Sequence, residues 1–245
     1  MPNNSVHKLT AEELPAALAK FIAEKQAAAI ARRGKFVVAL SGGSMPKVLG
    51  AALSGKHGKF KWPKWHIFYA DERCVALDHA DSTYLAYAAL FAAAAIPSAQ
   101  IYAIDPALAP SAAAQAYEAK LRAVFGAAMA LPALDMALLG LGPDGHTASL
   151  FPGHALLQHE CSWVASIEDS PKPPPSRITL SLPVLNASRQ VCFVATGAGK
   201  AELLPKVAVP EPDAAFPAAR IQPEELHWWV DEAAAAQMPG GKADL

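Results

Sequence analysis

The sequence predicts a three-layer α/β fold in which a largely parallel β-sheet carries helices on both faces. Short apolar runs that suit buried strands alternate along the chain with longer segments of helical spacing, and this alternation favours a parallel sheet. Glycine-rich turns follow several of the apolar runs. We find no internal repeat and no linker in the 245 residues, so we expect a single domain over residues 1–245.

The composition excludes several classes of protein. Hydrophobic residues make up 53% of the chain and charged residues 18%, which is enough apolar material for a core and no sign of disorder. With a formal net charge of −1 and no apolar run of membrane-spanning length, we expect neither a nucleic-acid partner nor a membrane partner. Any anionic ligand must therefore be held by a local cluster of donors.

Three widely spaced cysteines, Cys74, Cys161 and Cys192, fit neither a disulfide framework nor a zinc site. They favour buried thiols in a reducing compartment. Residues 1–10 lack the pattern of a signal peptide, so we expect a cytoplasmic protein. Our expectation for its assembly is a monomer or a weak homo-oligomer.

The first half of the chain alternates regularly between helices and strands. Thr10 and Glu13 form a potential capping box for the first helix, which should end at Gly34. The strands predicted after it cover residues 36–40, 65–69, 100–104 and 134–139. The helices predicted between them cover residues 45–53, 82–95 and 111–125.

Beyond residue 151 the pattern is less regular. Residues 170–177 are proline-rich and should form an extended, rigid loop over a pocket, with Lys172 available to an anion. The strands predicted here cover residues 163–166, 178–182, 191–195 and 227–230. We also predict a helix from about Ala201 and a closing helix over residues 231–237.

The turn Ser41-Gly42-Gly43-Ser44 joins a buried strand to a helix. At such a junction free backbone N–H groups and the helix dipole favour an anion, and Ser41 and Ser44 can add hydroxyl donors. The turn is neither a Walker loop nor a dinucleotide-binding fingerprint, and by itself it is weak evidence for a phosphate site.

Charged residues follow other predicted strands. Asp71 and Arg73 come after the strand over residues 65–69, and Lys200 ends a second glycine-rich turn. An arginine fork suits phosphate, although a surface ion pair would explain Asp71 and Arg73 as well. Arg177 lies beside the proline-rich loop and is a further candidate for binding an anion.

The segment Gly140-Leu141-Gly142-Pro143-Asp144-Gly145-His146-Thr147 is where we expect the chemistry. It follows a predicted strand, and Thr147 is a potential cap for a helix after it. A histidine at a helix N-terminus would be held neutral by the dipole, so His146 is the candidate general base. The alternative is a tight Gly-Asp-Gly turn with His146 on the surface.

In a parallel sheet these strand-to-helix turns open on one edge, so the predicted residues should meet around one crevice. The crevice would contain a phosphate cradle, cations and a base, and the spacing of the eight histidines suggests no metal site. The residues by themselves indicate acid–base chemistry on a small phosphorylated molecule.

These motifs resemble those of the 6-phosphogluconolactonases, within the wider glucosamine-6-phosphate isomerase/6-phosphogluconolactonase superfamily. Five ordered motifs between residues 35 and 235 carry the resemblance. They are LSGGS at 40–44, DER at 71–73 with DHADSTY at 78–84, GLGPDGHTASLFP at 140–152, SPKPPP at 170–175 with RITL at 177–180, and TGAGK at 196–200. The resemblance implies a Rossmann-like, NagB-type domain, from which the prolines of residues 207–219 depart where a helix would be expected.

The resemblance further implies hydrolysis of 6-phospho-D-glucono-1,5-lactone to 6-phosphogluconate in the oxidative pentose phosphate pathway, without metal or cofactor. His146 would deprotonate the attacking water and return the proton to the ring oxygen. Asp144 would orient either the imidazole or a substrate hydroxyl.

The substrate's 6-phosphate would be held by Arg73, Lys200 and the turn over residues 41–44, with Arg177 as an additional contributor. Asp71 completes the set of substrate-binding residues that we expect.

Three alternatives remain open at this stage. The first is isomerisation and deamination of glucosamine 6-phosphate, although those relatives place Asn-Glu-Pro where this chain has residues 150–152, Leu-Phe-Pro. The second is a serine hydrolase using Ser41, which lacks the Gly-x-Ser-x-Gly pattern. The third is a non-catalytic sugar-phosphate sensor, which would not need Asp144 and His146.

Overall fold

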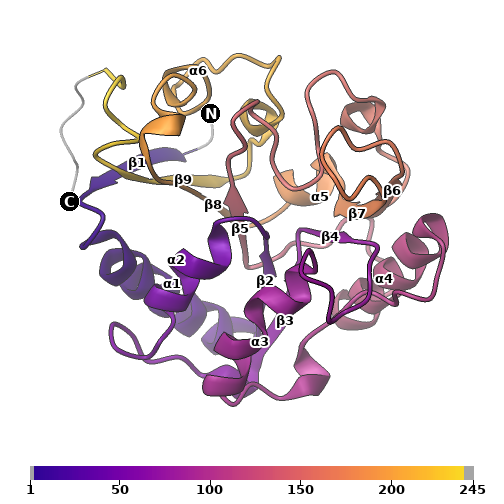
Figure 1. Ribbon diagram of the computed structural model, residues 1–245. Coiled ribbons are helices and arrows are strands. Elements are labelled where there is room, and N and C mark those ends of the chain that lie inside the picture. Colours follow the sequence, from indigo (N-terminus) through magenta and orange to yellow (C-terminus); the bar gives the residue numbers. More distant parts are fainter. Residues whose placement is uncertain (1–2, 240–245) are drawn as a thin grey trace.

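A computed structural model describes residues 3–239 and contains a six-stranded sheet in which every neighbouring pair of strands is parallel (Figure 1). In sheet order the strands are β1 (Asn3–Leu9), β9 (Glu225–Asp231), β8 (Gln190–Ala195), β5 (Met136–Gly140), β2 (Phe36–Leu40) and β3 (Trp65–Tyr69). The predicted parallel sheet with helices on both faces is confirmed. The carboxyl ends of its strands lie on one edge, which is where ligands bind in this class of fold.

Helices cover both faces of this sheet (Figure 1). One face is covered by α1 (Leu14–Arg33), α2 (Met45–Ala52) and α3 (Thr83–Ala93). The other face is covered by α4 (Pro110–Phe125), α5 (Leu182–Asn186) and α6 (Leu204–Val207).

Strand β2 shows how the two hydrophobic cores arise, because all five of its residues are buried. Phe36, Val38 and Leu40 pack with α1, α2 and α3, whereas Val37 and Ala39 belong to the core on the other face. Successive strand residues point to opposite faces, so a strand covered on both sides must be apolar throughout.

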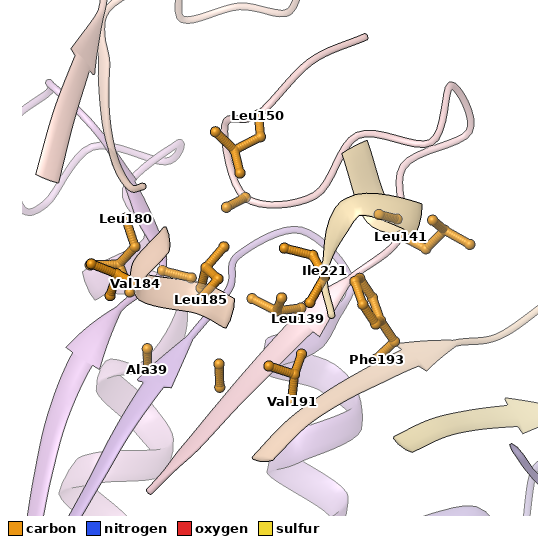
Figure 2. Packing of buried hydrophobic residues seen from close by; sticks show 14 of the residues in the cluster. Ala39, Leu139, Leu141, Leu150, Leu180, Val184, Leu185, Val191, Phe193 and Ile221 are labelled. Carbon is orange, nitrogen blue, oxygen red and sulfur yellow. The ribbon is translucent and has the colours of Figure 1, made fainter. Parts of the chain in front are cut away.

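Figure 2 shows the core on the second face, where Leu139 and Val191 of the central strands meet Ile221 and Leu185 of the covering segments. Leu141 and Leu150 belong to the same core and are 5% and 0% exposed. The loop between these two leucines is thus held at both ends by buried apolar side chains, and it carries Asp144 and His146.

A second, antiparallel sheet lies in the layer of α4 and consists of β4 (Asp71–Arg73), β7 (Arg177–Leu180) and β6 (Val164–Ile167). The sequence predicts a strand near β6 and another near β7 but gives no sign that they form a separate sheet. In the register of β4 and β7, Arg73 is paired with Arg177, so two of the predicted anion-binding residues are neighbours.

Two helix starts follow the expected chemistry. Thr10 and Glu13 exchange the reciprocal hydrogen bonds of a capping box immediately before α1. Ser82 caps α3 by accepting from the N–H of Leu85, and the buried carboxylate of Glu72 accepts from two further N–H groups at this helix start. Glu72 therefore ties α3 to β4.

Several predicted elements are wrong. Residues 100–104 form only an isolated bridge to β3, and the helix expected from Ala201 begins at Leu204 and has four residues. The closing helix predicted over residues 231–237 is not formed, because Asp231 ends β9 and residues 232–237 form turns. Strand β1, along the edge of the sheet, was not predicted. The expected departure from helix over residues 207–219 is seen, because α6 ends at Val207 and only a short 3₁₀ turn beginning at Pro217 follows it in this segment.

All three cysteines have free thiols, but the expectation that all are buried is wrong. Cys192 is buried, Cys74 is half-buried and Cys161 is exposed. Across residues 3–239, no helix combines the length and apolar character that crossing a bilayer requires.

Candidate active site

A cavity of about 220 Å³ opens at the edge of the sheet where the carboxyl ends of β2 and β5 lie. It is lined by residues from five separate segments of the chain. They are Ser41, Gly42, Gly43, Ser44, Asp71, Arg73, Gly140, Leu141, Gly142, Pro143, His146, Ala148, Arg177 and Lys200. Of the ten predicted site residues, nine line this cavity, and Asp144 contacts His146 from beside it.

The turn over residues 41–44 leads directly into α2, as predicted. Gly43 has a φ of +66°, which costs glycine little and other residues more. The buried Oγ of Ser41 has no hydrogen-bond partner within the described part of the chain, and the hydroxyl of Tyr87 donates to the Ser41 carbonyl at 2.7 Å. The turn is therefore held from α3 and leaves a donor free beside the cavity.

Arg73 and Lys200 bring positive charge to the cavity from different directions. Arg73 donates from Nη1 to the carbonyl of Asp81 at 2.6 Å, while its buried Nε has no partner among residues 3–239. Burial, together with the nearby charge of Lys172, lowers the pKa of Lys200. An anion in the cavity would give the Arg73 guanidinium a partner. It would also favour the charged form of Lys200 and so raise the lysine's pKa.

Arg177 lines the cavity but is engaged mainly elsewhere. Its Nε donates to the carbonyl of Pro174 at 2.9 Å, and its Nη2 donates to the carbonyls of Lys172 and Pro173 at 2.8 and 3.0 Å. Three of its hydrogen bonds thus fix the proline-rich loop. The proline-rich segment forms the expected loop, but none of residues 170–176 lines the cavity, and Arg177 holds the loop's backbone rather than standing free for an anion.

Asp71 is 5% exposed and lines the cavity from β4. Its Oδ2 accepts from Ser149 Oγ at 2.8 Å and lies 3.9 Å from Nη1 of Arg177. The alternative interpretation, a surface ion pair of Asp71 with Arg73, is not borne out among the described residues: Asp71 is buried, and its arginine partner is Arg177. Asp71 places a negative charge at one end of an otherwise positive cavity.

The segment after β5 is not the start of a helix, so this prediction is wrong. Thr147 forms an antiparallel bridge to Leu150, and its Oγ1 donates to the carbonyl of Gly140 at 3.0 Å. Ala148 has a φ of +48°, outside the helical region. The Thr147 side chain closes a compact loop instead of capping a helix.

His146 therefore owes its neutral state to a different cause from the one predicted. Burial lowers the pKa of its imidazole, and the contact with the Asp144 carboxylate opposes this effect. Nδ1 of the ring contacts Oδ1 of Asp144, and the ring packs against Phe151 with 4.9 Å between centroids. Burial, rather than a helix dipole, disfavours the imidazolium.

Asp144 stays ionised beside this ring. Burial opposes its ionisation, but hydrogen bonds from His146 and Lys172 outweigh that effect and lower its pKa to about 2. A carboxylate at this position accepts a hydrogen bond from Nδ1–H and leaves Nε2 as the basic nitrogen. Within residues 3–239 the hydrogen bonds of the imidazole all use Nδ1, so Nε2 is free.

The roles of two site residues were not identified from the sequence. A Cβ atom on Gly142 would lie 2.0 Å from Nδ1 of His146, so only glycine lets the ring lie against this backbone. Lys172 was expected to bind an anion, yet its Nζ lies 3.1 Å from Oδ1 of Asp144 and 3.0 Å from Nδ1 of His146. The Gly-x-Gly spacing around residue 142 was the available signal for the first; nothing local in the sequence indicates the second.

Comparisons with known proteins agree on one family. Residues 9–229 match the family model described as glucosamine-6-phosphate isomerases/6-phosphogluconolactonase. The chain is 46% identical over 231 residues to a rat (Rattus norvegicus) protein named 6-phosphogluconolactonase, covering 91% of this chain and 89% of the relative. It is 45% identical over 233 residues to the human protein of the same name, covering 92% and 90%.

The fold is shared with solved structures as well. The structure titled 6-phosphogluconolactonase from Trypanosoma cruzi superposes with a TM-score of 0.83 at 27% identity, covering 98% of this chain and 99% of the other.

Proposed function

This chain belongs to the glucosamine-6-phosphate isomerase/6-phosphogluconolactonase family, and we propose that it hydrolyses 6-phospho-D-glucono-1,5-lactone to 6-phospho-D-gluconate. The reaction is a step of the oxidative pentose phosphate pathway. The substrate is a small phosphorylated sugar lactone, which suits a cavity of about 220 Å³ that combines donors for an anion with a base.

The base is His146. Its neutral Nε2 takes a proton from water, and the hydroxide formed attacks the lactone carbonyl. The resulting imidazolium is stabilised by the ionised carboxylate of Asp144, which also fixes the tautomer. When the tetrahedral intermediate collapses, Nε2–H returns its proton to the ring oxygen and the ring opens.

The 6-phosphate binds to the turn over residues 41–44, to Arg73 and to Lys200. The turn supplies backbone donors at the start of α2 and the unpartnered hydroxyl of Ser41, while Arg73 and Lys200 supply charge. Arg177 contributes mainly by holding the proline-rich loop, and Asp71 offers an acceptor for sugar hydroxyls. Holding the phosphate fixes the distance from the C1 carbonyl to His146, which gives the rate advantage of orientation.

One observation carries this proposal above the others. The proposed phosphate cradle and the imidazole, which lie about a hundred residues apart in sequence, line a single cavity. An imidazole facing away from the Ser-Gly-Gly turn would have been incompatible with a lactonase.

A coupled assay tests the proposal. Glucose-6-phosphate dehydrogenase supplies fresh lactone, and 6-phosphogluconate dehydrogenase reports its hydrolysis as NADPH. We expect the protein to accelerate the second reaction over spontaneous opening of the lactone, and the matched variant His146→Gln to lose this acceleration. Turnover that equals the uncatalysed rate would contradict the proposal.

The proposal includes turnover without a metal ion, because the imidazole supplies the base and the cationic side chains compensate the phosphate charge. Dialysis against a chelator should leave kcat unchanged. A loss of activity that zinc or magnesium restores would show that this part is wrong.

The sister activity on glucosamine 6-phosphate has less support. Relatives with that activity place a glutamate within an Asn-Glu-Pro motif, and here Leu150 and Phe151 occupy this stretch with 0% and 1% exposure. A buried apolar pair cannot supply the extra carboxylate. The sensor alternative is disfavoured by the oriented pair of Asp144 and His146, which binding alone does not require.

The proposal treats residues 1–245 as one domain acting in the cytoplasm as a monomer or weak homo-oligomer. The single domain is supported by the pairing of β1 with β9, which joins both ends of the described chain in one sheet. The location is supported by the free thiols, and the assembly is tested by light scattering.

A further inference from the structure

Lys172 is the one cationic side chain whose nitrogen lies within hydrogen-bonding distance of both Asp144 and His146 in the described part of the chain. It enters from the proline-rich loop, 26 residues away from His146 in sequence. Its Nζ lies 3.1 Å from Oδ1 of Asp144 and 3.0 Å from Nδ1 of His146, so the three groups form a closed triangle. Neither the proposed phosphate cradle nor the proposed base includes this residue.

The proton arrangement in this triangle follows from elementary electrostatics. If Lys172 donated to a bare Nδ1, the lone pair of Nδ1 would face the carboxylate oxygen of Asp144, and two acceptors in contact repel. If Nδ1–H and Nζ–H both donate to Oδ1, both contacts with the carboxylate pair a donor with an acceptor, and only the 3.0 Å contact between Nζ and Nδ1 brings two donors together. The second arrangement leaves Nε2 unprotonated.

The charge of Lys172 then acts on the second protonation of the imidazole. An ammonium group about 3 Å from the ring opposes the imidazolium, whereas Asp144 favours it. Without Lys172, the ionised Asp144 would raise the pKa of His146 with less opposition and convert part of the base into its inactive protonated form.

The other charged groups around the imidazole come from three elements. Asp71 on β4 favours the imidazolium. Arg73 on β4, Arg177 on β7 and Lys200 line the same cavity and oppose it. Lys172 differs from these three cations because it contacts Nδ1 directly.

Arg177 explains how a lysine on a loop is held in this position. Its guanidinium donates to the carbonyls of Lys172, Pro173 and Pro174, and it is 3% exposed. Ser170 Oγ donates to the carbonyl of Lys172 at 2.9 Å and accepts from its N–H at 3.3 Å. Both sides of the Lys172 backbone are therefore fixed.

We propose that Lys172 is a positioning residue that keeps His146 neutral, with Nε2 as the free proton acceptor, and that Arg177 places it there by fixing the proline-rich loop. The inference rests on the proposed function only for its effect on catalysis. The effect on the titration of His146 belongs to the free protein and can be measured whether or not the protein is a lactonase.

The decisive experiment is an NMR titration of the His146 ring in the free protein, compared with the pH dependence of kcat/KM. In Lys172→Met the imidazole pKa should rise by about one unit, and the acidic limb of kcat/KM should move to higher pH by the same amount. Lys172→Arg should keep a pKa close to the wild-type value, because it retains the charge.

A matched control is Lys20→Met, which removes an exposed lysine of α1 and should change neither the ring titration nor kcat/KM. Thermal melting of each variant shows whether the fold persists. Should Lys172→Met fail to fold, the same comparison is made with Lys172→Gln, which keeps a polar side chain on the loop.

An unchanged His146 pKa in a folded Lys172→Met protein would overturn the proposal, whatever the activity. A raised KM with an unchanged pKa would also overturn it, since Lys172 would then be a phosphate ligand. If the wild-type protein lacked lactonase activity but its His146 titration shifted as expected, the proposed function would fail and this inference would stand.

The second half of the proposal has its own test. Arg177→Lys keeps the charge but should not hold all three carbonyls of the loop at once. Lys172 would then be less firmly placed beside His146, so the His146 pKa should rise, as in Lys172→Met. A folded Arg177→Lys protein with a wild-type titration would show that Arg177 does not position Lys172.

Discussion

The loops after β2 and β5 leave adjacent parallel strands at the same edge of the sheet, and both line the cavity. The loop after β2 continues into α2 and offers a helix start with free donors. The loop after β5 is closed on itself by Thr147 and is anchored by Leu141 and Leu150 in the core. The free N–H groups at a helix start provide positive partial charge for an anion. A neutral general base instead needs burial and a fixed tautomer.

This comparison shows that one sheet edge can meet two different electrostatic requirements, an anion site and a neutral base, around the same cavity. A helix start stabilises negative charge and would also favour a neutral imidazole, but the structure does not use it for that purpose. The pKa of His146 is lowered by burial in a loop that can be shaped independently of the phosphate cradle.

The largest effect is expected from removing the base. His146→Gln should lower kcat by at least ~100-fold with little change in KM, because the side chain acts on the reacting water and not on the phosphate. Steady-state kinetics in the coupled assay measure both constants. If the variant kept most of its kcat, His146 would not be the general base, and the loop after β5 would have no part in the chemistry.

Gly142→Ala should lower kcat by roughly 10- to 100-fold, since the new methyl group occupies the position of the imidazole ring and displaces the base. The fold should persist, because the displaced ring lies at the cavity and not in the core. The expected signature is an altered His146 resonance with a wild-type circular dichroism spectrum. Wild-type kinetics would show that the ring need not lie against this backbone.

Arg73→Ala should raise KM by about 10-fold or more with a smaller effect on kcat, because a charge-assisted bond to phosphate is lost. The corresponding measurement is inhibition by inorganic phosphate, which should weaken in parallel. An unchanged KM would separate Arg73 from the phosphate site and leave the cradle to the turn and Lys200.

The pH dependence of the wild-type protein sharpens the comparison further. A base works only when unprotonated, and burial lowers the pKa of His146 below its ordinary value of 6.5. kcat/KM should therefore begin to fall at a lower pH than it would for an ordinary imidazole, and it should decrease about tenfold per pH unit well below the lowered pKa. An acidic limb centred above 6.5 would contradict a desolvated ring.

Gly43→Ala should give the smallest effect, and it should act on stability. No heavy atom lies within 4 Å of the added methyl group, but the positive φ costs about 1–2 kcal/mol in the free energy of unfolding. Urea denaturation measures this cost. A decrease in kcat as large as that of Gly142→Ala would remove the contrast between the two loops.

The central strands could be predicted from the sequence because burial on both faces leaves an uninterrupted apolar run. The bounds of β2 and β3 agree with the predicted ranges for this reason. Strand β1 escaped prediction because Asn3–Leu9 is an edge strand, paired on one side only, and its sequence is largely polar.

Tertiary contacts explain the failures. Residues 231–237 contain four consecutive alanines, which favour helix, but the carboxylate of Asp231 binds the N–H groups of Gly197 and Ala234 and holds the segment as turns. After β5, the burial of both Leu150 and Phe151 overrides the local preference for a helix start.

Sequence motifs predicted which segments would meet at the cavity, but not how they contact one another. The parallel topology was sufficient to bring Ser41, Arg73 and His146 to one edge. The contact of Lys172 with Asp144 depends on a three-dimensional path of the proline-rich loop that no local spacing encodes. This is why Arg177 was expected to bind an anion, whereas it chiefly supports that loop.

The unequal exposure of the thiols has a practical consequence for chemical labelling. Burial raises the pKa of Cys192 to about 12 and that of Cys74 to about 11, so neither forms a reactive thiolate at neutral pH. Cys161 is exposed and should react first with maleimide reagents. The native chain thus offers a selective attachment point for a fluorophore without any substitution, outside the residues that line the cavity.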